Sequence, residues 1–104
     1  MDTVEEALAA VAAGRPVVVV DGEDRENEGD LIVAAELIDV ATMSFVVRHT
    51  SGFVCVALPG GECERLALPP LHAGGTDAFG TAYRVTVDAV DGVSTGISAR
   101  DRAR

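Results

Sequence analysis

Lysine is absent from this chain, and its eight basic residues are all arginines. Without lysine, no side chain is available to form a Schiff base with a carbonyl substrate. Seventeen acidic residues bring the formal net charge to −9. This charge argues against binding to nucleic acid or to an anionic membrane surface, because both require a positive protein surface. An anionic ligand must therefore be held by arginine, hydroxyl groups, backbone N–H groups or a metal ion.

The sequence also has few cysteines and no long apolar run. Cys55 and Cys63 are too few for a disulfide scaffold and form no C-x-x-C pair, so both are expected to be reduced. No apolar run approaches the length of a membrane span, and the acidic start lacks the basic segment of a signal peptide. The sequence thus predicts a soluble, cytoplasmic protein. With 104 residues it is expected to form a single domain.

The order of apolar and turn residues predicts an α+β fold, with a mixed β-sheet and flanking helices. Thr3 and Glu6 form a capping-box pattern at the start of a helix that Gly14 ends. Val17–Val20 is a β-branched run without alternation, which is typical of a strand buried on both faces. Further strands are predicted at 31–35, 53–58 and 81–89, further helices at 40–48, 62–67 and 99–102, and a loop at 71–80.

The most informative segment is EDRENEGD at residues 23–30, in which five of eight side chains are carboxylates. Carboxylates crowded between two predicted strands repel one another, so a compensating cation is expected. Mg²⁺ takes oxygen ligands, often one or two protein carboxylates together with waters and substrate oxygens. In an extended segment Glu26, Glu28 and Asp30 share one face. A solvated acidic turn is the alternative.

Within this segment the individual residues have different expected roles. Glu26 is the leading metal ligand, whereas Glu28 and Asp30 are expected to transfer protons or to bind substrate hydroxyls. Arg25 either orients a phosphate through its planar donor group or pairs with its acidic neighbours.

Two other polar segments are candidates for anion binding. Residues 48–52, RHTSG, form either a polar turn or an anion-binding turn. Residues 94–98, STGIS, precede a predicted helix, where backbone N–H groups bind phosphate or Ser98 simply caps the helix. Cys55 lies in an apolar run, so a buried and inert thiol is expected there, with a catalytic thiol as the alternative.

Taken together, these segments resemble 3,4-dihydroxy-2-butanone 4-phosphate synthase. The resemblance spans nearly the whole chain, in order, and each block alone is less specific than the set. The motifs that carry it are DRENEGDL at 24–31, RHTSG at 48–52 with Cys55, GTAY at 80–83, VTVD at 85–88, and GVSTGISA at 92–99 with Asp101 and Arg102.

The resemblance implies conversion of ribulose 5-phosphate to 3,4-dihydroxy-2-butanone 4-phosphate and formate in riboflavin biosynthesis, with Mg²⁺ or Mn²⁺, by a homodimer. Such a reaction needs carboxylates that move protons and a metal ion that stabilises the enediolate of the sugar. The implied catalytic residues are Glu28, Asp30 and Cys55, and the implied substrate-binding residues are Arg25, Glu26, Asp30 and Thr95, with Glu26 also the metal ligand.

Members of this family are longer, and two of their features have no counterpart in this sequence. An Arg-Pro-Gly-His segment, whose His is the second metal ligand, is missing, as is a late catalytic Glu. Within the matched part, Gly75 stands where the family usually carries Asn. We therefore expect an incomplete domain, equivalent to the N-terminal portion of the family's domain. A non-catalytic homologue that keeps the dimer scaffold and a weak metal or sugar-phosphate site is the alternative.

Overall fold

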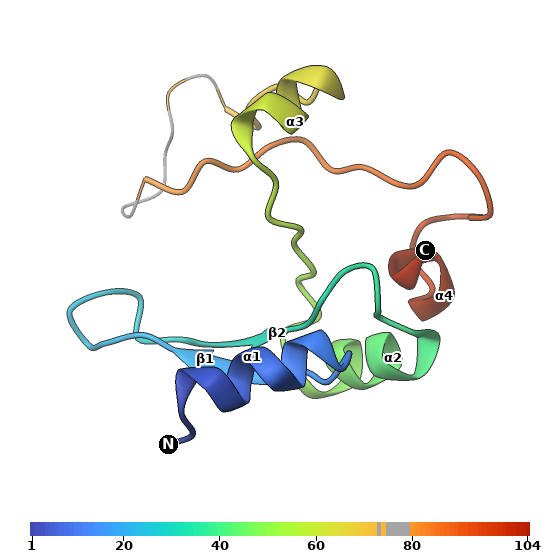
Figure 1. Ribbon diagram of the computed structural model, residues 1–104. Coiled ribbons are helices and arrows are strands. Elements are labelled where there is room, and N and C mark those ends of the chain that lie inside the picture. The colour runs from blue at the N-terminus through green and yellow to red at the C-terminus, as the bar shows by residue number, and fades with distance from the viewer. Residues whose placement is uncertain (73, 75–79) are drawn as a thin grey trace. The chain divides into compact units, whose positions relative to one another are not determined.

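The structure is a computed structural model of the chain, in which residues 1–72, 74 and 80–104 are described. It contains two compact units, Met1–Val54 with Asp88–Arg104 and Cys55–Val87 (Figure 1). The prediction of a single domain stays a prediction. The first unit contains α1 (Val4–Ala12), β1 (Val17–Val20), β2 (Gly29–Ile32), α2 (Val40–His49) and α4 (Ala99–Ala103), and the second contains α3 (Gly60–Arg65).

Helix α1 begins at the predicted capping box. The Thr3 hydroxyl accepts a hydrogen bond from the backbone N–H of Glu6 at 3.2 Å, and the Glu6 carboxylate accepts one from the backbone N–H of Thr3 at 2.9 Å. These two bonds satisfy N–H groups that have no partner within the helix. The helix ends where Gly14 adopts the left-handed conformation, with φ of 73°. This end brings the chain into β1, as the sequence predicted.

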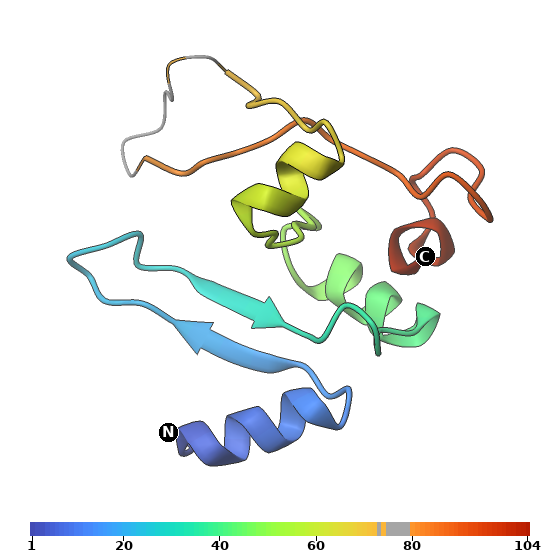
Figure 2. The ribbon, with the colours of Figure 1, turned by 45° about the horizontal axis from the view of Figure 1, so that its top comes forward.

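Strands β1 and β2 form an antiparallel hairpin, in which Val17 lies opposite Ile32 and Val20 opposite Gly29 (Figure 2). The second strand starts two residues before the predicted range of 31–35 and ends earlier, because its extent is set by pairing with the four residues of β1. The α+β class is confirmed. The sheet of the described residues is antiparallel and two-stranded, whereas a mixed sheet was expected.

The predicted burial of β1 on both faces is wrong for this structure. The exposed fractions of Val18, Val19 and Val20 are 69%, 51% and 58%. Among the described residues, β2 is the sole strand neighbour of β1, and the nine-residue helix α1 is the helix that packs against it. One short helix covers too little of a sheet to bury both of its faces. The valines therefore remain in contact with solvent.

Helix α2 provides the core of the first unit. Asp39 caps its start by accepting a hydrogen bond from the backbone N–H of Thr42 at 2.7 Å. Met43, on the next turn, is 3% exposed. Helix α4 packs against α2, and the Arg102 guanidinium donates a hydrogen bond to the carbonyl oxygen of Gly52 at 2.9 Å. This bond links the end of the chain to the turn that follows α2.

The second unit is organised around α3. The helix begins two residues before the predicted range of 62–67, and its Cys63 is buried at 6% exposure, as expected of a structural thiol. The helix ends at Arg65, and Ala67, just beyond it, adopts a left-handed φ of 52°. The following chain returns in a short antiparallel bridge between Pro70 and Arg84.

The strands predicted at 53–58 and 81–89 do not form, apart from the bridge at Arg84. A strand requires a neighbouring strand for its hydrogen bonds, and an alternating sequence alone does not supply one. Of the loop predicted at 71–80, residues 73 and 75–79 lie outside the described residues. No helix among the residues described has both the length and the apolar character needed to span a bilayer.

Candidate functional site

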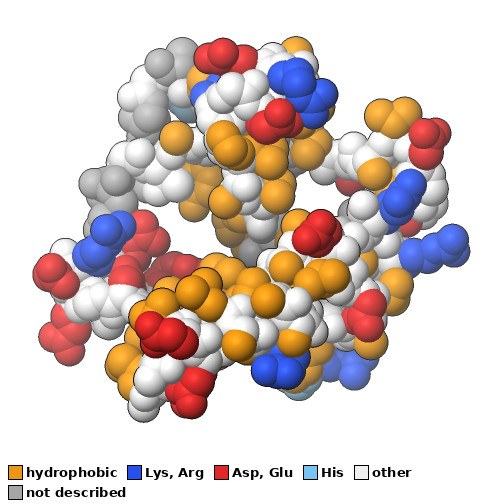
Figure 3. All heavy atoms as spheres, viewed as in Figure 1, with side chains coloured by type: hydrophobic (Ala, Val, Ile, Leu, Met, Phe, Trp, Pro, Cys, Tyr) orange, Lys and Arg blue, Asp and Glu red, His pale blue; other side chains and the backbone are white. Residues whose placement is uncertain are grey.

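The acidic segment forms the loop that joins β1 to β2, at residues 21–28. Asp21, the first residue of this loop, organises it from within. One oxygen of its carboxylate accepts a hydrogen bond from the backbone N–H of Glu28 at 2.7 Å, and the other accepts one from the backbone N–H of Glu26 at 2.8 Å. The loop is thus closed by one side chain, and acidic side chains gather around it (Figure 3).

The electrostatics of Asp21 follow from these contacts. The backbone N–H of Glu28 holds the pKa of the Asp21 carboxyl below its ordinary value, and the N–H of Glu26 and the Arg25 guanidinium act in the same direction. Loss of hydration raises this pKa, with an effect smaller than that of the Glu28 N–H but larger than those of the Glu26 N–H and Arg25. Asp21 therefore remains an anion at neutral pH and keeps its two acceptors available to the loop.

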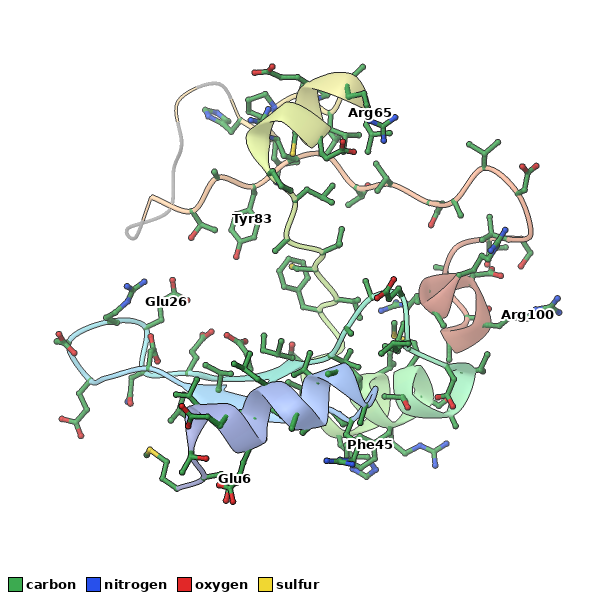
Figure 4. The ribbon with its side chains drawn as sticks, in the orientation of Figure 1. Glu6, Glu26, Phe45, Arg65, Tyr83 and Arg100 are labelled. Atoms are coloured by element: carbon green, nitrogen blue, oxygen red, sulfur yellow. The ribbon has the colours of Figure 1, made fainter. Side chains whose placement is uncertain are left out.

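The expected common face of Glu26, Glu28 and Asp30 is only partly present. The backbone N–H of Arg25 bonds to the carbonyl oxygen of Gly22 at 3.0 Å, so the chain turns before Glu26. Asn27 is then left-handed, with φ of 52°. The prediction of an extended segment is wrong here, because the chain must reverse direction between two paired strands. Glu26 consequently lies on the turning part of the loop (Figure 4).

A groove of about 570 Å³ lies in the first unit, between the start of β2 and the end of α2. Both Glu28 and Asp30 line it, together with Val18, Gly29 and Leu31 from the hairpin. From α2 and the following turn it is lined by Phe45, Val46, His49, Thr50, Ser51 and Phe53. The structure thereby brings two predicted acid–base residues together with the polar turn at 48–52.

The turn at the rim of this groove is held by its own hydroxyl groups. The Thr50 hydroxyl donates a hydrogen bond to the carbonyl oxygen of Val46 at 2.7 Å and accepts one from the backbone N–H of Gly52 at 3.1 Å. The ring of His49 lies against that of Phe45, with centroids 4.6 Å apart. His49 adds a third group capable of proton transfer beside Glu28 and Asp30, a role that sequence alone did not assign.

The segment at 94–98 is also held by a carboxylate. Asp101, which is 8% exposed, accepts hydrogen bonds from the hydroxyl of Ser94 at 2.8 Å and from the backbone N–H groups of Ser94 and Gly96 at 3.1 and 3.0 Å. The Ser94 hydroxyl is the main cause that lowers the pKa of Asp101. Ser98 caps α4 through the backbone N–H of Asp101 at 3.0 Å. These contacts favour the capping interpretation over a phosphate site.

The remaining predicted site residues are more widely distributed. Arg25 lies with Glu26 in the loop, and Thr95 lies in the segment held by Asp101; none of the three lines the groove. Cys55 belongs to the second unit and is exposed, so its predicted burial is wrong. It is exposed because its segment pairs with no other strand among the residues described.

The oxygen donors of the loop suit a hard divalent cation. Within the described part of the chain, no three His, Cys, Asp or Glu side chains are arranged to hold a metal ion together. Mg²⁺ needs fewer protein ligands, because waters and substrate oxygens complete its six-coordinate shell. Carboxylates such as that of Glu26 fit this partial role.

The chain belongs to the 3,4-dihydroxy-2-butanone 4-phosphate synthase family, whose model matches residues 5–104. It is 61% identical to the riboflavin biosynthesis protein RibBA of Salinispora tropica and 59% identical to that of Nocardia farcinica; each match covers 98% of this chain. A solved synthase in complex with two magnesium ions superposes with a TM-score of 0.95 at 44% identity, and that of Candida albicans with 0.84 at 51%.

These matches cover this chain far more completely than they cover the relatives. The chain spans 26% of the Salinispora protein and 25% of the Nocardia protein. The two superpositions each include 99% of this chain, but they include only 48% of the magnesium-bound synthase and 50% of the Candida synthase. The family and its fold are therefore established over about half of a solved domain.

Proposed function

We propose that this chain supplies the acidic-loop half of the active site of a 3,4-dihydroxy-2-butanone 4-phosphate synthase. The substrate is ribulose 5-phosphate, and the products are 3,4-dihydroxy-2-butanone 4-phosphate and formate. The observation that carries the proposal is the placement of Glu28 and Asp30 in one groove, next to a loop closed by Asp21, in a chain of this family.

The groups in the groove match the chemistry that this reaction demands. Proton removal from carbon and its return to oxygen need bases and acids within reach of the sugar. Glu28 acts as the acid–base group, and Asp30 binds substrate hydroxyls and assists in proton transfer. Arg25 is the cation of the loop and orients the phosphate, because its planar fork matches phosphate oxygens. Thr95 is a further substrate-binding residue, and Cys55 is proposed as a catalytic residue.

A divalent cation is part of this proposal, and Glu26 is its ligand from the loop. The solved relative that binds two magnesium ions favours Mg²⁺, with Mn²⁺ as a substitute. When bound, the cation polarises the oxygens of the sugar and offsets the negative charge that the acidic loop presents to an anionic substrate. The protein side of the site then needs no organic cofactor.

The test measures formate release from ribulose 5-phosphate by this chain, mixed with the residues that follow the matched region in the Salinispora relative. We call this second component the complementing polypeptide. Formate is expected with Mg²⁺ and not with a chelator. Glu28→Gln should lower the rate by at least about 100-fold, since a general acid–base group contributes that much. Glu23→Gln, in the same loop, is the matched control and should leave the rate unchanged.

A second function is favoured by the chain matching about half of each solved synthase. Under this second function, the protein keeps the homodimer scaffold and a weak sugar-phosphate or metal site but has no synthase activity. Metal-dependent binding of ribulose 5-phosphate by the mixture, without release of formate, would identify this function.

A further inference from the structure

The segment that carries Thr95 is held on both sides by one carboxylate. The Oδ2 atom of Asp101 accepts hydrogen bonds from the Ser94 hydroxyl at 2.8 Å and from the backbone N–H groups of Ser94 and Gly96 at 3.1 and 3.0 Å. Ser94 and Gly96 are the two neighbours of Thr95 in the chain. Because both neighbours are bonded to the same oxygen, the backbone of Thr95 is fixed from both sides.

The side chain of Thr95, in contrast, is available to a ligand. It is exposed, and within the described part of the chain its hydroxyl has no hydrogen-bond partner. The N–H groups of Ser94 and Gly96 are bonded to Asp101, so they are not available in the same way. A free hydroxyl on a fixed backbone is preorganised for binding, because little conformational entropy is lost when a ligand binds.

Gly96 gives this segment a shape that requires glycine. Its φ of 77° lies in the left-handed region, which glycine adopts without a steric cost. A Cβ atom at this position would also overlap the carboxylate of Asp88, which lies directly against Gly96. The turn that follows Thr95 is therefore confined by Asp88 on one side and by the bond to Asp101 on the other.

The residue after Asp101 connects this segment to the turn that follows α2. The guanidinium of Arg102 donates hydrogen bonds to the carbonyl oxygens of Ile97 at 3.0 Å and Gly52 at 2.9 Å. Part of that turn lines the groove that contains the proposed acid–base groups. Asp101 thus holds the backbone around Thr95, and Arg102 attaches the segment to the rim of the groove.

We infer that Asp101 is a positioning residue for the sugar phosphate, and that it acts through Thr95 without touching the substrate. Its side chain is 8% exposed and its Oδ2 atom already accepts three hydrogen bonds, so the carboxylate is occupied by its own chain. The inference rests on the proposed function, in which Thr95 binds substrate. The competing explanation is that Asp101 only stabilises the fold.

A carboxylate suits this role better than a neutral amide. Three donors converge on one oxygen, and an ionised acceptor forms hydrogen bonds about twice as strong as a neutral one does. Asp101→Asn keeps the size of the side chain but leaves a weaker acceptor beside an NH₂ group that cannot accept. In the chain alone, amide hydrogen exchange at Ser94 and Gly96 should therefore become at least about tenfold faster in this variant.

The main experiment measures the Kd of ribulose 5-phosphate for the mixture of this chain and the complementing polypeptide, with Mg²⁺, by isothermal titration calorimetry. Glu28→Gln is present throughout, so that turnover is at least about 100-fold slower. Thr95→Ala and Asp101→Asn should each weaken binding by about tenfold, and the double variant should also lose about tenfold. The losses do not add because Asp101 acts through the hydroxyl that Thr95→Ala removes.

Matched variants separate positioning from a loss of charge and from misfolding. Asp91→Asn removes the same charge from an exposed side chain in the same unit, and it should leave the Kd and the amide exchange unchanged. Ser94→Ala removes one of the three donors and should weaken binding by about threefold. Ser94→Thr keeps the hydroxyl and should restore the affinity. The Ser94 pair tests the inference even if Asp101→Asn does not fold.

Two results would overturn the inference alone. The first is a double variant whose loss equals the product of the two single losses, since Asp101 would then act independently of Thr95. The second is an unchanged affinity in a folded Asp101→Asn or Ser94→Ala variant. A mixture with the unaltered chain that binds no ribulose 5-phosphate would contradict the proposed function and this inference with it. Binding without release of formate would leave this inference standing and contradict the synthase activity.

Discussion

Arg102 provides a sharp test of how the first unit is held together. Its guanidinium donates one hydrogen bond to the carbonyl oxygen of Gly52 at 2.9 Å and another to that of Ile97 at 3.0 Å. The first bond joins residues 50 positions apart in the sequence, and it fixes the turn beside the groove to α4. Arg102→Ala removes both bonds and leaves two carbonyl oxygens without this donor.

The size of the destabilisation expected from Arg102→Ala follows from how exposed the two hydrogen bonds are. A hydrogen bond to a charged group contributes about 1.5–3 kcal/mol. The bond to Gly52 is partly buried and contributes about 1.5 kcal/mol, whereas the bond to Ile97 is exposed and contributes about 0.5 kcal/mol. Arg102→Ala should thus destabilise the unit by about 2 kcal/mol. For a chain of this size, that lowers the unfolding midpoint by about 10 °C.

Arg100→Ala is the matched control for this measurement. Arg100 is on the same short helix, and its side chain is exposed and points away from α4 (Figure 4). Its removal should shift the midpoint, followed by circular dichroism, by less than about 2 °C, as for most surface substitutions. Arg102→Lys retains one donor group in place of the fork and should fall between the two. Equal midpoints for Arg100→Ala and Arg102→Ala would refute the assigned role of Arg102.

Three further predictions concern the core, a helix end and the response to acid. Met43→Ala should cost about 2–5 kcal/mol by denaturant unfolding, because Met43 is 3% exposed and its removal leaves a cavity. Ala67→Gly should raise stability by about 0.5–1 kcal/mol in the same assay, since glycine adopts its φ of 52° without the steric cost that alanine incurs. Asp21 and Asp101 have folded-state pKa values below their ordinary values. Their contribution to the free energy of unfolding is therefore present above about pH 4 and is lost as the pH falls through the lowered pKa. In an acid titration, Asp21→Asn and Asp101→Asn should each lose less stability than the parent chain does.

The local parts of the fold could be predicted from sequence, because they depend on neighbouring residues. The capping box at Thr3 and a strand on each side of the acidic segment are present as expected, and Ser98 caps α4, which was one of the two interpretations of that segment. The strands expected at 53–58 and 81–89 are absent, because a strand depends on a partner strand that its own residues do not specify. The apolar patterns in these two segments indicate that each favours an extended conformation, but they do not identify the strand with which it would pair.

In the candidate site, too, residues recognisable from their local sequence could be predicted, whereas residues that act through distant contacts could not. Glu28 and Asp30 could be singled out because their residue types and spacing suit acid–base chemistry. Asp21 and Asp101 were missed, since each acts through backbone N–H groups five to seven residues away along the chain. A signal for Asp21 was nevertheless present: an aspartate directly after a strand often accepts hydrogen bonds from the N–H groups of the following turn.

The most direct test of the proposed function is formate release from ribulose 5-phosphate by the one-to-one mixture of this chain and the complementing polypeptide. The prediction is formate with Mg²⁺, none with a chelator, none from either component alone, and a loss of at least about 100-fold with Glu28→Gln. A complex that forms, binds Mg²⁺ and yet releases no formate would contradict the assignment of the acidic loop and its groove as half of a synthase active site.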